Sequence, residues 1–184
     1  RLAPDDDVVL SNQASLLYQS GNTAEALSTL ARAVALSPRD AVNRAFLGKL
    51  MVQSGKSKEG LNELTRALRL NPKNAFVLGQ YGIAKYMVKE GRDVEAAKKS
   101  LEGALQGDSL RYPEFYFYLG RIYLDKSDAK NAKANLAKAV ALEPTQAEYR
   151  LFYGKALAAN GDRTDAQRQY NEALRLQPDY KDAR

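Results

Sequence analysis

The chain has 184 residues, of which 45% are hydrophobic and 27% charged, enough apolar surface for a folded domain with a well-solvated exterior. It contains no cysteine and no histidine, which excludes disulfides, Cys/His zinc sites, thiol nucleophiles and histidine-based catalytic triads. No apolar run approaches the ~18 residues of a membrane-spanning helix, and the lack of cysteine suits the cytosol and the periplasm equally. Of the net charge of +6, +5 falls in residues 41–74, which favours either a solvated face or an acidic partner.

Prolines recur along the chain and set the length of an internal repeat. The interval from Pro38 to Pro72 equals that from Pro144 to Pro178, and a period of about 34 residues is typical of helical or solenoid arrays. The interval from Pro72 to Pro144 exceeds two such periods by four positions, so it holds one longer repeat that lacks its proline. The chain therefore divides into repeats 1 to 5, at 7–40, 41–74, 75–112, 113–146 and 147–180.

Each repeat contains two helical patterns. In repeat 4, Tyr116, Leu119 and Tyr123 share one face of a first helix. Ala132 and Leu136 share one face of a second helix, which the proline near the end of the repeat terminates. Short segments rich in Gly, Ser, Asn and Asp connect the two helices. Because no strand-like alternation of polar and apolar residues occurs, the predicted fold class is all-α.

Small residues recur at one position of each predicted helix. The first helices carry Ala14, Gly48, Gly82, Gly120 and Gly154 at this position, and the second helices carry Ala26, Gly60, Ala97, Ala132 and Ala166. A glycine inside a helix costs about 1 kcal/mol relative to alanine, so glycine at one position of four first helices needs a structural reason. We expect the backbones of the two helices in each repeat to approach closely there.

These features resemble the tetratricopeptide repeat (TPR), whose pattern over about 34 residues is W-x2-L-G-x2-Y, then A-x3-F, then P. The fullest match is repeat 4, with Tyr116-x2-Leu119-Gly120-x2-Tyr123, Ala132-x3-Leu136 and Pro144. The resemblance covers nearly the whole chain. It implies a single domain over residues 1–184, a solenoid of about five helix-turn-helix repeats that stack into a right-handed superhelix with the first helices on the concave side. Residues 181–184 would begin a further helix.

Repeat 3 is longer than the others. The interval from Gly82 to Ala97 exceeds the equivalent interval of every other repeat by three positions, so three extra residues fall around the KEGRD stretch. The fourth extra residue falls in QGDSLRYPE. Such an insertion is either a neutral length variant or one that extends a helix or loop and bends the stack locally.

No pattern in the sequence indicates catalysis. The GKSKEG stretch lacks the spacing of a phosphate-binding loop and follows no strand. Basic residues are scattered over both helices of each repeat, and most of the 11 tyrosines fall at core positions, which argues against nucleic-acid binding. We therefore predict no catalytic residue, no metal and no cofactor.

The TPR resemblance implies that first-helix residues line a groove for a partner. The predicted partner-binding residues are Tyr18, Phe46, Lys49, Phe76, Tyr86, Phe117, Tyr118, Arg121, Phe152 and Lys155. Aromatic side chains beside spaced cations favour a protein or peptide partner with acidic and apolar side chains.

Two details of this set can be checked against the structure. Lys49, Arg121 and Lys155 occupy the same position in three repeats, so their charges are expected to form one stripe. Phe46 and Phe152 could instead pack between repeats.

Two functions fit these predictions. The compact, alanine-rich repeats are similar to those of bacterial TPR proteins, including ones that assist assembly of cell-envelope machines such as type IV pilus secretins. This favours a non-catalytic interaction scaffold that binds a peptide segment of its partner and that could assist the assembly of a bacterial cell-envelope complex. The alternative is a substrate- or partner-recruiting arm of a larger enzyme, such as a glycosyltransferase or kinase. The chain could also self-associate through its C-terminal face, because the last apolar face of a repeat array has to be covered.

Overall fold

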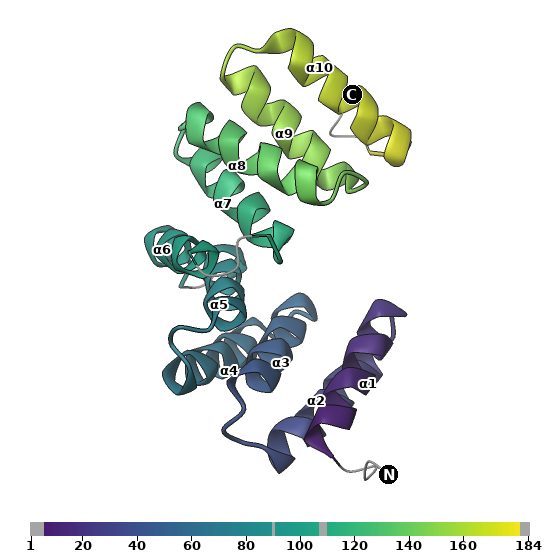
Figure 1. Cartoon of the computed structure of the whole chain (residues 1–184), viewed down its shortest axis with the longest axis vertical. Helices are drawn as coiled ribbons and strands as arrows, with labels where there is room; N and C mark the ends of the chain where they lie inside the picture. The colour runs from purple at the N-terminus through teal and green to yellow at the C-terminus, as the bar shows by residue number, and fades with distance from the viewer. Residues whose placement is uncertain (1–5, 90, 107–109, 181–184) are drawn as a thin grey trace. The chain divides into compact units, whose positions relative to one another are not determined.

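The computed structural model describes residues 6–89, 91–106 and 110–180, and within these ranges the chain forms ten α-helices and no strand (Figure 1). The all-α prediction is therefore confirmed. Among the described residues, no helix is long and apolar enough to cross a membrane. The predicted start of a further helix at 181–184 lies outside the described residues.

The helices fall into two compact units, Arg1–Gly107 and Asp108–Arg184. The first unit contains α1 (Asp7–Gln19), α2 (Thr23–Leu36), α3 (Ala41–Gln53), α4 (Ser57–Leu70), α5 (Ala75–Met87) and α6 (Val94–Leu105). The second unit contains α7 (Pro113–Asp125), α8 (Ala129–Leu142), α9 (Ala147–Ala159) and α10 (Arg163–Leu176). The single domain over 1–184 remains a prediction.

Consecutive helices pair in the way the repeats predict. The pairs are α1 with α2, α3 with α4, α5 with α6, α7 with α8, and α9 with α10 (Figure 1). Within the first unit, α2 contacts α3, and α5 contacts both α4 and α3; within the second, α9 contacts both α8 and α7. The first helices α3 and α5, and likewise α7 and α9, therefore lie against each other as well as against their own partners.

The local sequence explains where the helices begin and end. Asp40 and Asn74 cap α3 and α5 by accepting hydrogen bonds from backbone amides three residues further on, which satisfies amides that lack a partner within the helix. The helices α2, α4, α8 and α10 each end two residues before a proline of the repeat, as predicted.

The small residues bring the paired helices into backbone contact, as predicted. A Cβ atom on Gly48 would lie 2.8 Å from the carbonyl oxygen of Gly60, and one on Gly60 would lie 2.7 Å from the carbonyl oxygen of Gly48. A Cβ atom on Gly120 would lie 2.5 Å from Cγ of Leu136. Carbon atoms pack at about 3.5–4.0 Å, so these helix pairs leave no room for a side chain.

The insertion in repeat 3 lengthens a loop and leaves the helix before it unchanged. In repeat 2 the amide of Lys56 donates to the carbonyl oxygen of Met51 at 2.8 Å, which closes the turn after α3. In repeat 3 the amide of Asp93 donates to the equivalent carbonyl oxygen, that of Lys85, at 3.1 Å. Helices α3 and α5 both have 13 residues, so the three extra residues form an excursion within the connection. The fourth extra residue falls in the connection after α6, part of which lies outside the described residues.

Two arginines tie a repeat to the one before it. Arg44 donates to the carbonyl oxygen of Pro38, at the end of repeat 1, and forms an ion pair with Glu63 of its own repeat. Arg150 occupies the same position in repeat 5, where it donates to the carbonyl oxygen of the preceding proline at 2.7 Å and to the side-chain oxygen of Gln169 at 3.1 Å. This contact between repeats was not predicted from the sequence.

Candidate functional site

The ten predicted partner-binding residues all lie on first helices. Three of these helices, α1, α3 and α5, belong to the first compact unit, and two, α7 and α9, belong to the second (Figure 1).

In the second unit, cations and aromatic rings meet between α7 and α9. The guanidinium carbon of Arg121 lies 4.6 Å from the centre of the Phe152 ring, 5.4 Å from that of Phe117 and 5.5 Å from that of Tyr118. The ammonium nitrogen of Lys155 lies 4.9 Å from the centre of the same Phe152 ring. These distances allow favourable cation–π contact. We call these five residues the α7–α9 cluster; it brings Arg121 and Lys155 to one aromatic ring.

Phe117 is the buried member of this cluster. Its side chain is only 1% exposed, stacks on Tyr149 with ring centres 4.6 Å apart, and meets Phe152 edge to face at 5.3 Å. The side chains of Phe152 and Tyr118 are partly exposed. The prediction that Phe117 itself lines a groove does not fit this burial, because a partner could not reach the ring while α7 and α9 stay packed. Phe117 instead holds the Phe152 ring in place.

A carboxylate borders the α7–α9 cluster and was not among the predicted residues. Glu148, at the start of α9, lies 3.8 Å from a guanidinium nitrogen of Arg121, and its side chain is 48% exposed. The Arg121 side chain is 27% exposed. A long ion pair to an exposed glutamate contributes little stability, so a partner carboxylate could replace Glu148 beside Arg121 at small cost. Glu148 is the second residue of α9, one turn before Phe152 on the same helix, and this spacing was the signal in the sequence that could have identified it.

Acidic groups surround the buried ring beneath the cluster. Burial raises the pKa of Tyr149, and the charge of Glu143 raises it further. Burial, followed by the charge of Glu114, also raises the pKa of the Glu143 carboxyl group. The Tyr149 phenol therefore stays neutral at physiological pH and acts as a packing surface for Phe117.

A second cluster of the same kind lies between α1 and α3 in the first unit. The Tyr18 ring meets the Phe46 ring edge to face with centres 6.1 Å apart, and the ammonium nitrogen of Lys49 lies 5.8 Å from the centre of the Tyr18 ring. The Tyr18 hydroxyl donates to the side-chain oxygen of Gln53 at 3.0 Å. Phe46 also packs against the core formed by the first three helices, so the alternative that it packs between repeats is borne out in part. We call these four residues the α1–α3 cluster.

Helix α5 offers less exposed aromatic surface. Tyr86 is only 7% exposed, and the guanidinium carbon of Arg92 lies 4.6 Å from its ring centre. Phe76 is partly buried against the core shared by α3, α4 and α5. The structure thus places the predicted groove residue Tyr86 in the interior, where its ring helps to fill the core.

Lys49 lies in the first unit and Arg121 and Lys155 in the second, so one continuous charged stripe remains a prediction. Among the described residues, no group of three or more acidic, histidine or cysteine side chains is placed to hold a metal ion.

Comparison with known proteins agrees with this architecture. Three family models described as tetratricopeptide repeat match residues 17–82, 113–146 and 154–184. The search of curated proteins found no match. The solved structure of pilF from Pseudomonas aeruginosa is 26% identical over 92% of this chain and 76% of that one, with a TM-score of 0.75. TTC0263, a TPR protein of Thermus thermophilus, is 22% identical over 96% of this chain and 94% of its own, with a TM-score of 0.75.

A third similar structure is that of YrrB, described as a TPR protein with an unusual peptide-binding site. It is 22% identical over 97% of this chain and 90% of its own, with a TM-score of 0.64. At this level of identity, the likeness to TTC0263 and YrrB concerns the fold.

Proposed function

Because this chain belongs to the tetratricopeptide repeat family, we propose that it is an interaction scaffold without catalytic activity that binds a peptide segment of a partner protein along its first helices. YrrB, a similar structure described as having a peptide-binding site, supports a peptide as the type of ligand. Fold alone does not define a function, so the proposal rests on the chemistry of the first-helix surface.

The observation that carries the proposal is the recurrence of a cation beside partly exposed aromatic rings. Lys49 lies over Tyr18 in the α1–α3 cluster, and Arg121 and Lys155 lie over Phe152 in the α7–α9 cluster. In each case the rings offer apolar area and the cation offers a charge-assisted hydrogen bond to a carboxylate. The proposed partner segment therefore carries apolar side chains close to acidic ones.

The proposed setting is the assembly of a bacterial multiprotein complex at the cell envelope. Its support is the likeness in sequence and fold to pilF, a protein of the bacterium Pseudomonas aeruginosa. Self-association through the C-terminal face remains a further prediction.

The test begins with affinity capture of the partner from the cell of origin, followed by identification of the bound segment by mass spectrometry. Calorimetry then compares the parent with a double charge reversal in the α7–α9 cluster, Arg121→Glu with Lys155→Glu. The matched control reverses two exposed lysines of the second helix α8, Lys130→Glu with Lys138→Glu. We expect the first variant to bind at least about tenfold more weakly, with a reduced salt dependence, and the control to bind within about twofold of the parent.

A second pair of substitutions tests the apolar contribution. Tyr118→Ala with Phe152→Ala should weaken binding by about 2 kcal/mol or more, roughly thirtyfold, if the exposed rings anchor the segment. Phe117 is left intact because its loss would create a cavity in the core. If both the charge and the ring variants stay folded and bind like the parent, the partner uses another surface and the proposal is wrong.

A further inference from the structure

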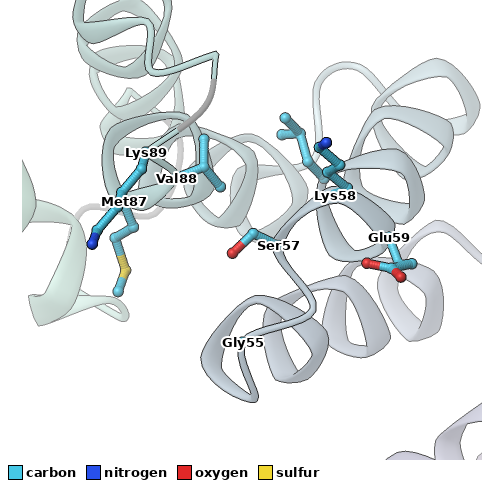
Figure 2. Close-up of a pocket in the computed structure, with 8 residues that line it drawn as sticks. Gly55, Ser57, Lys58, Glu59, Met87, Val88 and Lys89 are labelled. Atoms are coloured by element: carbon cyan, nitrogen blue, oxygen red, sulfur yellow. The ribbon is translucent and has the colours of Figure 1, made fainter.

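A hollow of about 510 Å³ lies in the first compact unit and shares no lining residue with the first-helix clusters. It opens between the turn that joins α3 to α4 and the segment that leaves the end of α5 (Figure 2). One wall is formed by Gly55 of the turn and Ser57 at the start of α4, and the opposite wall by Met87 and Lys89. In Figure 2 the hydroxyl group of Ser57 points into the space toward Met87. None of the residues that line the hollow belongs to the predicted partner-binding set.

The hollow owes its second wall to the insertion in repeat 3. The other first helices continue from a C-cap residue near helical geometry into a residue with positive φ, such as Gly55 at 83°. At the end of α5 the C-cap Val88 is instead extended, with φ −66° and ψ 134°, so the chain leaves the helix in another direction. The Asp93 amide then restores the usual hydrogen bond to Lys85. Lys89, in the inserted stretch, therefore lies across the hollow from the neighbouring turn, and the repeat pattern resumes at Asp93.

The side chain at the end of α5 also departs from the repeat pattern. Met87 is 45% exposed, whereas the same position carries Gln19, Gln53, Asp125 and Ala159 in the other repeats. Leu61 is partly buried in the wall of the hollow, and Val88, 3% exposed, forms its floor. The hollow thus offers a small apolar surface that an unbranched or branched aliphatic side chain could cover.

Charged side chains flank this apolar surface. Lys58 and Lys89 line the hollow and are both exposed, with Glu59 as the acidic residue beside them. The repeat that supplies Lys58 carries a net charge of +5, counting seven Lys and Arg against two Glu. One of those two, Glu63, pairs with both Arg44 and Arg66, on another part of the repeat. Of the charged residues that line the hollow, two are lysines and one is a glutamate, a net charge of +1 that favours an acidic ligand.

We infer that this hollow is a second docking site for a partner protein, specific for a short segment in which an aliphatic side chain is flanked by carboxylates. The aliphatic side chain covers Met87 and Leu61, and the carboxylates face Lys58 and Lys89. The hollow shares no residue with the α1–α3 or α7–α9 cluster, so the protein could hold two segments at once. Two such contacts would raise the overall affinity without new chemistry at either site.

The experiment uses the whole chain and a defined probe, an acetylated and amidated hexapeptide of sequence Glu-Leu-Glu-Met-Glu-Leu. Amide chemical shifts of the isotope-labelled protein are followed by NMR during titration with this peptide and with a control peptide in which lysine replaces glutamate. We expect saturable shifts centred on Gly55, Ser57 and Met87 with the acidic peptide alone.

Substitutions then assign the contacts. Met87→Gln, which restores the residue found in repeats 1 and 2, should weaken binding at the hollow at least tenfold, as should Lys58→Glu with Lys89→Glu. The matched control, Lys73→Glu with Lys99→Glu, makes the same change of net charge at exposed positions outside the hollow and should stay within about threefold of the parent.

The outcomes separate this site from the first-helix surface. Reversal of Lys49 and Arg121 should leave the shifts at the hollow unchanged, even if it abolishes binding elsewhere. The inference is overturned if shifts appear only at the α1–α3 and α7–α9 clusters, if the lysine peptide produces the same shifts at the hollow, or if no saturable shift occurs there. It is also overturned if the hollow's signals move with protein concentration in the absence of peptide, because the occupant would then be a second copy of the chain.

Discussion

Replacement of Gly48 by alanine tests the close approach of paired helices. The added Cβ would lie 2.7 Å from Cγ of Leu64, 2.8 Å from the carbonyl oxygen of Gly60 and 3.1 Å from the amide nitrogen of Leu64. Two of these three atoms belong to the backbone of α4, and Leu64 is fully buried. The clash therefore cannot be relieved by rotation of a flexible side chain, and α4 has to move away from α3.

The expected magnitude follows from two opposing effects. Overpacking of a core costs about 1–3 kcal/mol, and contact with backbone atoms places this case in the upper part of that range. Alanine in place of a helical glycine recovers about 1 kcal/mol of helix propensity. The net loss is about 1–2 kcal/mol, which for a chain of this size lowers the melting temperature by about 2–8 °C.

A glycine elsewhere in the same unit provides the control. A Cβ on Gly103 in α6 would have Leu78 Cδ1 as its nearest neighbour, at 3.8 Å, an ordinary contact. Gly103→Ala should therefore gain up to about 1 kcal/mol and raise the melting temperature, measured for both variants by far-ultraviolet circular dichroism. If Gly48→Ala melts at or above the parent temperature, the argument from backbone contact is wrong.

Three further predictions concern stability. Gly120→Leu should lower the free energy of unfolding in urea by about 3 kcal/mol or more, because the Cβ atom of the new side chain already clashes with the buried Leu136. Parent-like stability would show that repeat 4 is assigned in the wrong phase. Arg150→Met should cost about 1 kcal/mol in the same assay, since it removes the hydrogen bond to the preceding repeat, and an unchanged midpoint would make that contact incidental. Lys133 donates to Asp162, which lowers the pKa of the Asp162 carboxyl below its ordinary 3.8 and raises the pKa of the Lys133 ammonium group above 10.5. The stability that this ion pair adds is therefore fully present between pH 3.8 and pH 10.5. The difference in unfolding free energy between the parent and Lys133→Met should vanish as the pH falls through the lowered pKa of Asp162. A difference in unfolding free energy that persists in acid would point to packing instead.

The repeat pattern predicted most of the fold because it is a property of local sequence. Proline cannot continue a helix, so the regular spacing of Pro38, Pro72, Pro144 and Pro178 marked the ends of four second helices within two residues. The glycines and alanines at one position marked the contact between paired helices, because close backbone approach needs small residues on both sides. Helix existence and pairing were therefore open to prediction.

The clusters on the first helices were harder to predict, because burial there depends on the neighbouring repeat. Phe117 and Tyr118 are adjacent in sequence, yet Phe117 is buried on Tyr149 while Tyr118 stays partly exposed. Phe117 is covered by Tyr149 and Phe152 of α9, a contact with the next repeat that the sequence of repeat 4 does not reveal. The same reasoning applies to Tyr86, which the sequence alone placed on the surface of a groove.

The insertion in repeat 3 shows a second limit of the sequence. The length of repeat 3 showed that it holds three extra residues. The length did not show that the Asp93 amide would donate to the Lys85 carbonyl and so keep the hydrogen bond that closes the shorter turns. The length of the repeat also does not reveal that the backbone at Val88, just after α5, is extended. Nor does it reveal that Met87 lies beside the turn of repeat 2. Such features depend on contacts between repeats.

Lysine footprinting of the protein in complex with its captured partner tests the proposed binding surface most directly. A limiting amount of an acylating reagent modifies accessible lysines, and mass spectrometry gives the rate at each position with and without the partner. The proposal predicts that the partner slows modification of Lys49 and Lys155, on first helices, and leaves Lys130 and Lys138, on the second helix α8, unchanged. Slower modification of Lys130 and Lys138 with unchanged rates at Lys49 and Lys155 would contradict it.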